Sequence, residues 1–186
     1  MEVTGIILAG GKSSRMGTDK GLIPFNGVPM IQHLINELED LKIPIVIISN
    51  NTDYEQFGFP VIEDLVKEKG PVAGIYTALT NSSTEYNIVL SCDAPFVKKE
   101  VLNMLMEKAI GQDVVISSYN GKQHPLIAVY AKTATIAFKT SLDKDQLRLQ
   151  EVNQLLKTCI VDFTDKMEAS MFANINTQEE LKELEL

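Results

Sequence analysis

A glycine-rich segment between Leu8 and Lys20 holds the residues best suited to chemistry. It contains three glycines and three basic residues, and it follows an apolar run over residues 3–8 that is typical of a short buried strand. Glycines let backbone N–H groups come close to an oxyanion, and Lys12, Arg15 and Lys20 add positive charge. The combination indicates a polyphosphate-binding loop, whereas an isolated Gly-Gly-Lys would indicate a solvated surface loop.

Two common nucleotide-binding motifs do not fit this segment. Gly11-Lys12-Ser13 looks like the end of a P-loop, but that motif needs a glycine five residues before its Gly-Lys pair, and Ile6 occupies the position. The G-x-G-x-x-G fingerprint of dinucleotide-binding folds is also absent. We therefore expect the segment to bind phosphate through another geometry.

A second candidate, Asp93, follows an apolar run over residues 88–90. A carboxylate at the carboxyl end of a central strand suits Mg²⁺, which takes one or two protein carboxylates and completes its octahedron with water and phosphate oxygens. Alone, an Asp-x-Pro sequence is more often a cap or a turn. Together with the glycine-rich segment it predicts that Asp93 binds a metal ion, while the neighbouring Cys92 is expected to be a small core residue.

The composition is that of an ordinary globular chain of 186 residues, and we expect one domain. A net charge of −8 argues against a nucleic-acid groove and requires the few cations to be concentrated where an anion binds. Cys92 and Cys159 lack metal-binding spacing, which favours reduced thiols in a cytoplasmic protein. The sequence after Met1 lacks the basic region of a signal peptide, and no apolar run approaches membrane-spanning length.

Apolar periodicity predicts strands that alternate with amphipathic helices. The expected strands cover residues 3–8, 45–49, 61–64, 88–90, 113–117, 126–130 and 159–163. The expected helices cover residues 30–41, 73–79, 100–110, 131–140, 146–156 and 178–186. This alternation is typical of an α/β protein with a mostly parallel sheet. The Asn120-Gly121 turn between two strands indicates an antiparallel pair, so the sheet should be mixed.

The carboxyl ends of these strands collect the polar candidates, and ligands of open α/β sheets bind at that edge. Asp64 follows the third strand, where its carboxylate could accept hydrogen bonds from a base or a ribose, or could cap a helix. At the end of the second strand, Ser49, Asn50 and Asn51 are alternatives for one nucleotide contact. Turn formation explains the two asparagines equally well.

Five segments of the chain together resemble one enzyme family. They are Leu8-Ala9-Gly10-Gly11-x-Ser13-x-Arg15-Met16-Gly17-x-Asp19-Lys20, Gly70-Pro71-Val72-Ala73-Gly74, Cys92-Asp93-Ala94-Pro95, Gln123-His124-Pro125 and Asn174-Ile175-Asn176-Thr177. The set resembles the molybdenum cofactor guanylyltransferases, which belong to the larger group of nucleotidyltransferases that activate sugars and cofactors with NTPs. The resemblance covers nearly the whole chain.

The resemblance implies a single Rossmann-like, three-layer nucleotidyltransferase domain over residues 1–186. It implies a GTP-binding part at about 1–110 and an acceptor-binding part at about 111–186. The implied reaction transfers GMP from GTP to Mo-molybdopterin, with Mg²⁺ as the metal ion, and yields molybdopterin guanine dinucleotide and pyrophosphate. An accessory GTPase and molybdoenzymes or their chaperones are implied as partners, with no nucleic acid and no membrane.

The resemblance also implies roles for individual residues. The catalytic residues would be Arg15, Lys20 and Asp93, with Asp93 also holding the metal. The GTP-binding residues would be Leu8, Ala9, Gly10, Gly11, Lys20, Asp64, Gly70, Gly74 and Asp93. The acceptor-binding residues would be His124, Arg148, Asn174 and Asn176.

Asn174 and Asn176 lie two residues apart on a segment expected to be extended, so their side-chain amides should point the same way. Thr177 is expected to cap the following helix, with Glu180 completing a capping box. For Arg148 an ordinary solvated helix cation is an equally good interpretation.

Three alternatives to guanylyl transfer remain open at this point. CTP-dependent relatives tend to carry Leu-Ala-Ala-Gly where this chain has Leu8-Ala9-Gly10-Gly11, and the smaller Gly10 leaves room for a purine. Transferases that act on sugar phosphates usually have longer chains and added domains. A non-catalytic nucleotide- or cofactor-binding protein would not need Arg15, Lys20 and Asp93 together.

Overall fold

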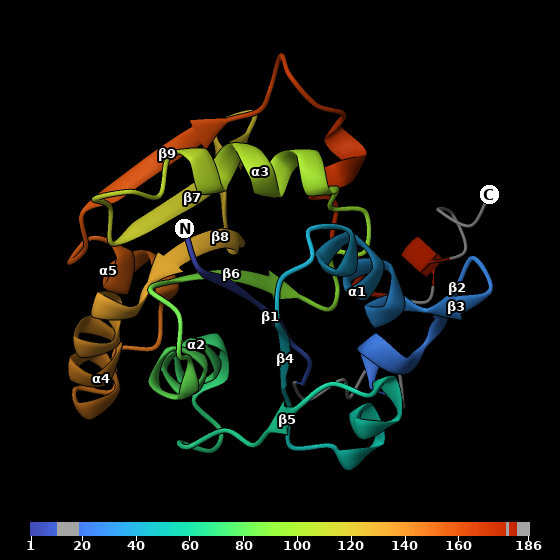
Figure 1. Ribbon diagram of the computed structural model, residues 1–186, viewed down its shortest axis with the longest axis horizontal. Coiled ribbons are helices and arrows are strands. Elements are labelled where there is room, and N and C mark those ends of the chain that lie inside the picture. Colours follow the sequence, from blue (N-terminus) through green and yellow to red (C-terminus); the bar gives the residue numbers. More distant parts are fainter. Residues whose placement is uncertain (11–18, 178, 182–186) are drawn as a thin grey trace.

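The computed structural model describes residues 1–10, 19–177 and 179–181, and it contains a seven-stranded sheet in the order β5-β4-β1-β6-β8-β7-β9 (Figure 1). The strands are β1 (Val3–Leu8), β4 (Ile45–Ile48), β5 (Val61–Ile62), β6 (Tyr86–Ser91), β7 (Val114–Tyr119), β8 (Lys122–Ala131) and β9 (Thr158–Asp162). Every pairing is parallel except those of β8, which runs antiparallel to both β6 and β7. The predicted α/β class and the mostly parallel, mixed sheet are confirmed.

Helices cover both faces of the sheet and complete three layers (Figure 1). The α-helices are α1 (Met30–Asp40), α2 (Gly70–Asn81), α3 (Lys99–Glu107), α4 (Thr135–Asp143) and α5 (Leu149–Asn153). The short 3-10 helices are η1 (Lys20–Leu22), η2 (Thr52–Phe57), η3 (Lys132–Ala134) and η4 (Ala169–Phe172). The first and third α-helices pack on one face, and the other three pack on the opposite face.

Two predicted helices have other bounds in the structure. The helix expected over residues 131–140 begins only at Thr135, because Ala131 still pairs with β6 as the last residue of β8 and Lys132–Ala134 form η3. The helix expected over 146–156 is reduced to α5, because the Gln146 N–H donates to the carbonyl of Ser141 at 2.8 Å and closes a turn after α4. Of the charged helix expected over 178–186, residues 178 and 182–186 lie outside the described part of the chain.

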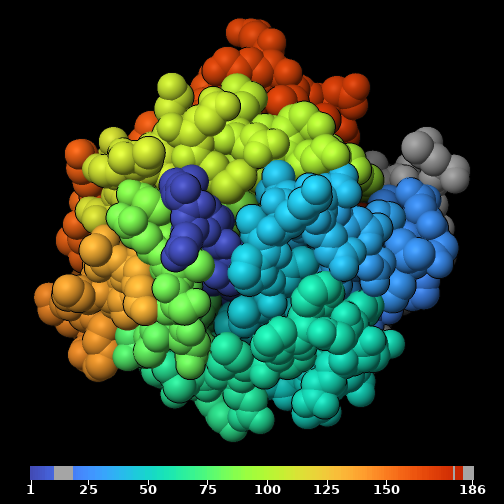
Figure 2. All heavy atoms as spheres, in the orientation of Figure 1, coloured from blue at the N-terminus to red at the C-terminus, as the bar shows by residue number. Residues whose placement is uncertain are grey.

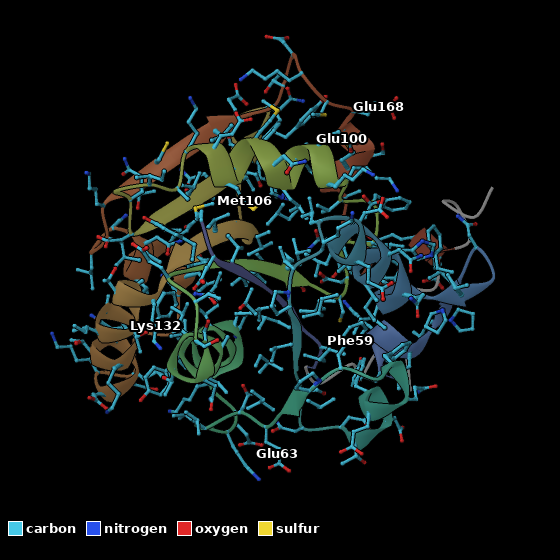
Figure 3. All side chains as sticks on the ribbon, viewed as in Figure 1. Phe59, Glu63, Glu100, Met106, Lys132 and Glu168 are labelled. Atoms are coloured by element: carbon cyan, nitrogen blue, oxygen red, sulfur yellow. The ribbon has the colours of Figure 1, made fainter. Side chains whose placement is uncertain are left out.

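The core lies on both sides of the sheet, as the continuous apolar strands require (Figure 3). All six residues of β1 are buried. A Cβ placed on Gly5 would come within 2.9 Å of the Leu38 side chain, so this glycine lets α1 pack directly on β1. In Figure 2 the N-terminal residues lie near the centre of one face, and β1 runs from there into the core. Within the described ranges, no helix has the length and apolarity needed to cross a bilayer.

Two Asn-Gly turns form tight hairpins, because both residues of each pair adopt positive φ. Asn26 and Gly27 (φ 48° and 84°) join β2 (Pro24–Phe25) to β3 (Val28–Pro29). Asn120 and Gly121 (φ 49° and 75°) join β7 to β8, which confirms the predicted antiparallel pair. The β7–β8 register then shifts between Ile116 and Ser117.

This irregularity has a local cause in β8. Pro125 has no N–H to donate to a neighbouring strand, and prolines within sheets are confined to edges and bulges. On one side of the shift Ile116 pairs with Ala128, and on the other Ser117 pairs with His124. His124 is thereby placed on the hairpin end of β8, beyond the strand's pairing with β6.

Candidate active site

The carboxyl ends of four parallel strands lie at one level. Leu8 is in register with Ile48 of β4 and Ser91 of β6, and Ile48 is in register with Ile62 of β5. The alignment continues one step further, because the Ala9 N–H donates to the carbonyl of Ile48 at 2.9 Å. The segments that leave this edge therefore start side by side. They begin at residues 9–10, 49–50, 63–64 and 92–93.

Lys20, Asp93, Asn174 and Asn176 meet beyond this edge. The Lys20 ammonium donates to Oδ1 of Asn176 at 2.9 Å and lies 3.9 Å from Oδ2 of Asp93. The amide of Asn174 donates to Oδ1 of Asp93 at 3.4 Å. The Lys20 and Asp93 side chains are 21% and 18% exposed, so their ion pair is partly shielded from water while the groups remain accessible.

The C-terminal segment is fixed to this group by its backbone. The Ile175 N–H donates to the carbonyl of Asp93 at 2.8 Å. Glu180 accepts from the N–H groups of Asn176 and Thr177, at 2.6 and 3.3 Å, and its own N–H donates to the Thr177 hydroxyl at 3.1 Å. The predicted capping box is confirmed, and it holds the segment so that both asparagine amides face the same group.

The donor set at Asp93 fits a magnesium ion. Mg²⁺ prefers oxygen ligands and commonly binds through a single protein carboxylate, with water and phosphate oxygens completing its shell. Asp93 offers one partly exposed carboxylate with amide groups beside it. In the ranges that the structure describes, no cluster of three or more His, Cys, Asp or Glu residues forms a closed metal cage. The arrangement therefore suits a metal that arrives with a nucleotide.

Cys92 is a core residue, as expected. Its side chain is buried, and burial raises the pKa of the thiol to about 12, with the carboxylates of Asp93 and Asp19 adding to the shift. A thiol with this pKa is not a nucleophile near neutral pH. The chemistry of this edge therefore depends on the lysine, the carboxylates and the amides.

Asn50 and Asp64 form a second polar pair at the same edge. The Asp64 N–H donates to Oδ1 of Asn50 at 3.1 Å, and the Asn50 amide donates to Oδ2 of Asp64 at 3.4 Å. The alternatives to Asn50 serve the backbone instead, because Ser49 accepts from the N–H of Asn51 and Asn51 accepts from the N–H of Asp53. Of the three residues left open by the sequence, Asn50 is the one that faces Asp64.

The other oxygen of Asp64 is an acceptor without a partner among the described residues. Oδ1 is buried and has no hydrogen-bond partner among the described residues. Burial raises the pKa of this carboxyl, an effect that the Asn50 hydrogen bond partly opposes. A Cβ on Gly74 would lie 3.3 Å from Leu8 and 3.8 Å from Oδ1, so the first turn of α2 packs closely beside it. Gly70, at the start of α2, has a φ of 60° that favours glycine.

Leu8, Ala9 and Gly10 form the described part of the glycine-rich segment. Leu8 and Ala9 are buried, so a ligand at this edge would meet their backbone rather than their side chains. Gly10 is exposed, and among residues 1–10, 19–177 and 179–181 a Cβ placed there would meet only the Ser49 hydroxyl, at 3.9 Å. The predicted site residues Gly11 and Arg15 lie outside the described residues.

His124 belongs to a separate, aromatic region. Its half-buried ring lies 5.5 Å from the ring of Phe172, which also stacks on Tyr119 at 5.3 Å. Burial lowers the pKa of His124, and the positive charge of Lys122 lowers it further. The imidazole is therefore neutral at pH 7, when it can donate one hydrogen bond and accept another.

Arg148 lies apart from the other candidates. It is the N-cap of α5, its side chain is 84% exposed, and it forms an ion pair with Glu151 at 3.4 Å. An exposed pair of this kind contributes little to stability. The structure therefore brings six predicted residues into two groups at the same edge of the sheet, and His124 and Arg148 belong to neither group. The six are Lys20, Asn50, Asp64, Asp93, Asn174 and Asn176.

Sequence reasoning missed two residues behind Lys20. Asp19 is the N-cap of η1, and its carboxylate accepts from the Gly21 N–H at 3.4 Å and from the hydroxyl of Tyr54. Asp19 was part of the recognised segment, but its type gave no role. Tyr54 gave no signal, because a single tyrosine after a strand is indistinguishable from ordinary core.

Comparison with known proteins agrees with this geometry. The family model for the MobA-like NTP transferase domain matches residues 5–157. The chain belongs to this family. The match contains β4, β5, α2, β6 and the last four residues of β1, and therefore the strand-end positions described above.

The chain's relatives match along nearly their whole length. A probable molybdenum cofactor guanylyltransferase of Flavobacterium johnsoniae is 35% identical, over 99% of this chain and 97% of that protein. A molybdenum cofactor guanylyltransferase of Shewanella halifaxensis is 30% identical, over 98% and 94%. The crystal structure of molybdopterin-guanine dinucleotide biosynthesis protein A from Archaeoglobus fulgidus superposes with a TM-score of 0.82, at 26% identity over 98% and 96% of the two chains. The resemblance read from the sequence is confirmed.

Proposed function

We propose that this member of the family transfers GMP from GTP to Mo-molybdopterin, forming molybdopterin guanine dinucleotide and pyrophosphate. The observation that carries the proposal is the meeting of Lys20 and Asp93, whose charged groups lie 3.9 Å apart at the sheet edge where α/β proteins bind ligands. The identities of the donor and the acceptor are inferred from the relatives that are named molybdenum cofactor guanylyltransferases and match over nearly their whole length.

The reaction needs positioning and charge stabilisation more than acid–base chemistry. The acceptor is a phosphate monoester, which is already a competent nucleophile near neutral pH. Its attack on the α-phosphate breaks the bond to the β-phosphate and releases pyrophosphate. The Lys20 ammonium is held by Asn176 where it can neutralise charge that develops on these phosphates. Arg15 is proposed as a second cation for the same purpose.

Asp93 is the residue proposed to hold Mg²⁺, with Asn174 and Asn176 beside it to orient water or phosphate oxygens. A bound Mg²⁺ would supply further neutralisation of the triphosphate. Asn174 donates to Asp93 and so fixes the direction in which its carboxylate points. These contacts support a role for the two asparagines on the donor side of the site, in addition to the acceptor role expected from the sequence.

Asn50 and Asp64 are proposed to bind the guanosine. The free, buried acceptor at Oδ1 of Asp64 is suited to a donor from the base or the ribose. Gly74 lets α2 pack close to this oxygen, and Gly70 provides the positive φ at the start of the helix. Gly70, Gly74, Leu8, Ala9, Gly10 and Gly11 are proposed to contact GTP mainly through their backbone.

The division into a GTP-binding part at about 1–110 and an acceptor-binding part at about 111–186 is part of the same proposal. The hydrogen bonds of Asn174 and Asn176 to Asp93 and Lys20 support a junction between the two parts at this point. His124 and Arg148 are proposed to meet the anionic acceptor. An accessory GTPase, molybdoenzymes or their chaperones, and a cytoplasmic location are proposed with it. The two unbridged cysteines are consistent with that location.

A nucleotide panel tests the proposal. Melting temperatures are measured with GTP, CTP, ATP and UTP, each with and without Mg²⁺, because a ligand that binds only the folded state raises the melting temperature. GTP with Mg²⁺ should give the largest rise. A preference for CTP would overturn guanylyl transfer in favour of the related cytidylyl transfer. Gly10→Ala is the variant to compare with the unchanged protein, because the alanine has room among the residues that the structure describes but would approach the base.

A further inference from the structure

Tyr54 is a buried phenol directly behind Lys20. It lies in η2, which follows β4, and its side chain is 0% exposed. Its ring packs in the core beside Phe57, with 6.2 Å between the ring centroids. A hydroxyl buried in such a place needs a partner. The partner is the carboxylate of Asp19, to which the hydroxyl donates.

Asp19 connects this phenol to the turn that carries Lys20. It is the N-cap of η1, and the same Oδ1 that accepts from Tyr54 also accepts from the Gly21 N–H at 3.4 Å. The Asp19 carbonyl accepts from the Leu22 N–H at 3.0 Å and closes the turn. Lys20 lies between these anchored residues, so the direction of its side chain depends on them.

Gly21 shows that the turn and the tyrosine fit each other closely. A Cβ at this position would come within 2.5 Å of the Tyr54 hydroxyl oxygen and 3.1–3.2 Å of its ring carbons. The φ of Gly21 is not in the left-handed region, so conformational freedom does not explain the glycine. Space for the tyrosine does.

We propose that Tyr54 is a positioning residue for nucleotidyl transfer: its hydroxyl fixes the carboxylate of Asp19, and Asp19 fixes the turn that presents Lys20 to the site. The proposal rests on the transferase function proposed above. A lysine is a flexible side chain, and a cation stabilises a transition state best when it is already in place. The tyrosine would supply this preorganisation from the core without touching the substrate.

The phenol can hold this contact throughout the working pH range. Burial raises the pKa of Tyr54 well above its usual range, and the neighbouring Cys92 and Asp19 add to the shift. The proton therefore remains on the phenol, which stays a donor to Asp19. The hydrogen bond from Tyr54 to Asp19 therefore does not change with pH near neutrality through ionisation of the phenol.

Tyr54→Phe removes the hydroxyl and keeps the ring. Its matched control is Tyr86→Phe, at the start of β6, where a buried hydroxyl accepts from the Gly111 N–H at 3.2 Å. Each variant loses one hydrogen bond of a buried tyrosine. We expect Tyr54→Phe to lower kcat for GMP transfer roughly tenfold, with a smaller change in KM for GTP, as for a lost buried hydrogen bond to a charged group. Tyr86→Phe should leave both within about twofold, and equal kinetics of the two variants would overturn the proposal.

A second pair of measurements separates this proposal from the proposed function. Amide exchange at Gly21, measured without nucleotide, should be faster in Tyr54→Phe and unchanged in Tyr86→Phe, because the Gly21 N–H donates to Asp19. Unchanged exchange would overturn the positioning role whatever the activity. Faster exchange in a protein that transfers no GMP would support the role of Tyr54 in fixing the Lys20 turn. It would overturn the transferase function instead.

A double mutant keeps the proposal testable should Tyr54→Phe be destabilised. Asp19→Ala removes the carboxylate that accepts from both Tyr54 and Gly21, and Asp19 is only partly buried. We expect it to lower kcat at least as much as Tyr54→Phe does. If Tyr54 acts through Asp19, adding Tyr54→Phe to Asp19→Ala should cause little further loss. If the factors by which the two substitutions lower kcat multiply in the double mutant, Tyr54 does not act through Asp19, and the proposal fails.

Discussion

The regions proposed to bind the two substrates are built differently. In the region proposed for the nucleotide, Lys20, Asp93, Asn174 and Asn176 come from distant parts of the chain and are joined by hydrogen bonds and an ion pair. Of the residues proposed for the acceptor, His124 contacts an aromatic ring and Arg148 projects into solvent beside Glu151.

The contrast teaches where preorganisation is concentrated. Charges that stabilise a phosphoryl transition state act best when their directions are fixed before substrate binds. Two contacts fix these directions: the capping box at Thr177 and Glu180, and the hydrogen bond between Tyr54 and Asp19. Arg148, which is exposed, and His124, which is half-buried, would be ordered to a larger extent by the bound substrate.

The largest effect is expected on the nucleotide side. Lys20→Ala or Asp93→Ala should each lower the rate of GMP transfer by roughly a hundredfold or more, the scale seen when one electrostatic stabiliser of a transition state is lost. Pyrophosphate release measures the rate. Lys98→Ala is the control, because it removes a lysine whose 2.8 Å ion pair, with Glu37, lies elsewhere on the surface. A folded Lys20→Ala or Asp93→Ala enzyme with nearly normal turnover would refute the assignment.

A smaller loss is expected from Asp64→Asn. The substitution keeps the size of the side chain but removes the charge and replaces one acceptor oxygen with an amide donor. We expect KM for GTP to rise about tenfold while kcat changes less, because a hydrogen bond to a charged acceptor is lost in the bound state. Steady-state kinetics with GTP varied would measure both constants. An unchanged KM would mean that the free oxygen of Asp64 does not face the nucleotide.

His124 should affect the acceptor and the pH dependence of stability. His124→Phe is expected to raise KM for Mo-molybdopterin a few-fold and to leave KM for GTP unchanged.

The same histidine should make stability depend on pH. Because burial lowers the pKa of His124, its neutral imidazole contributes stability at pH values above the ordinary pKa of 6.5, and this contribution is lost as pH falls below 6.5. Melting temperatures between about pH 7 and pH 5 should therefore fall more for the wild-type protein than for His124→Phe. Equal slopes would contradict the pKa direction.

The smallest effect is expected from Arg148→Ala. Its side chain is 84% exposed and its ion pair with Glu151 is 3.4 Å long, so the melting temperature should hardly change. KM for Mo-molybdopterin should rise no more than about twofold to threefold. A loss as large as that of Lys20→Ala would show that the acceptor closes this region tightly, and the contrast between the two sides would disappear.

The sequence predicted those features that arise from periodicity and local chemistry. Continuous apolar runs predicted the buried parallel strands, Asn120-Gly121 predicted the antiparallel hairpin, and Thr177 with Glu180 predicted the capping box. Asp64 and Asp93 were expected at strand ends, where they lie. The fold class therefore followed from patterns of a few residues.

Contacts between distant segments were beyond such patterns. Nothing in the sequence pairs Tyr54 with Asp19, because they are 35 residues apart and a lone tyrosine suits any core. The choice of Asn50 among three neighbouring residues also needed the structure, since it depends on which side chain faces Asp64 at the end of the adjacent strand. The shortening of the helix expected over 146–156 has a local cause, the turn that Gln146 closes on Ser141 after α4, which the apolar periodicity did not indicate.

Guanylyl transfer itself is tested most directly by following the label of α-³²P-GTP in the presence of Mo-molybdopterin and Mg²⁺. The label should appear in a molybdopterin dinucleotide together with one pyrophosphate released per transfer, and Lys20→Ala should slow both by roughly a hundredfold or more. Labelled CTP should be a much poorer donor. Transfer from CTP in preference to GTP, or nucleotide binding with no transfer at all, would contradict the proposed function.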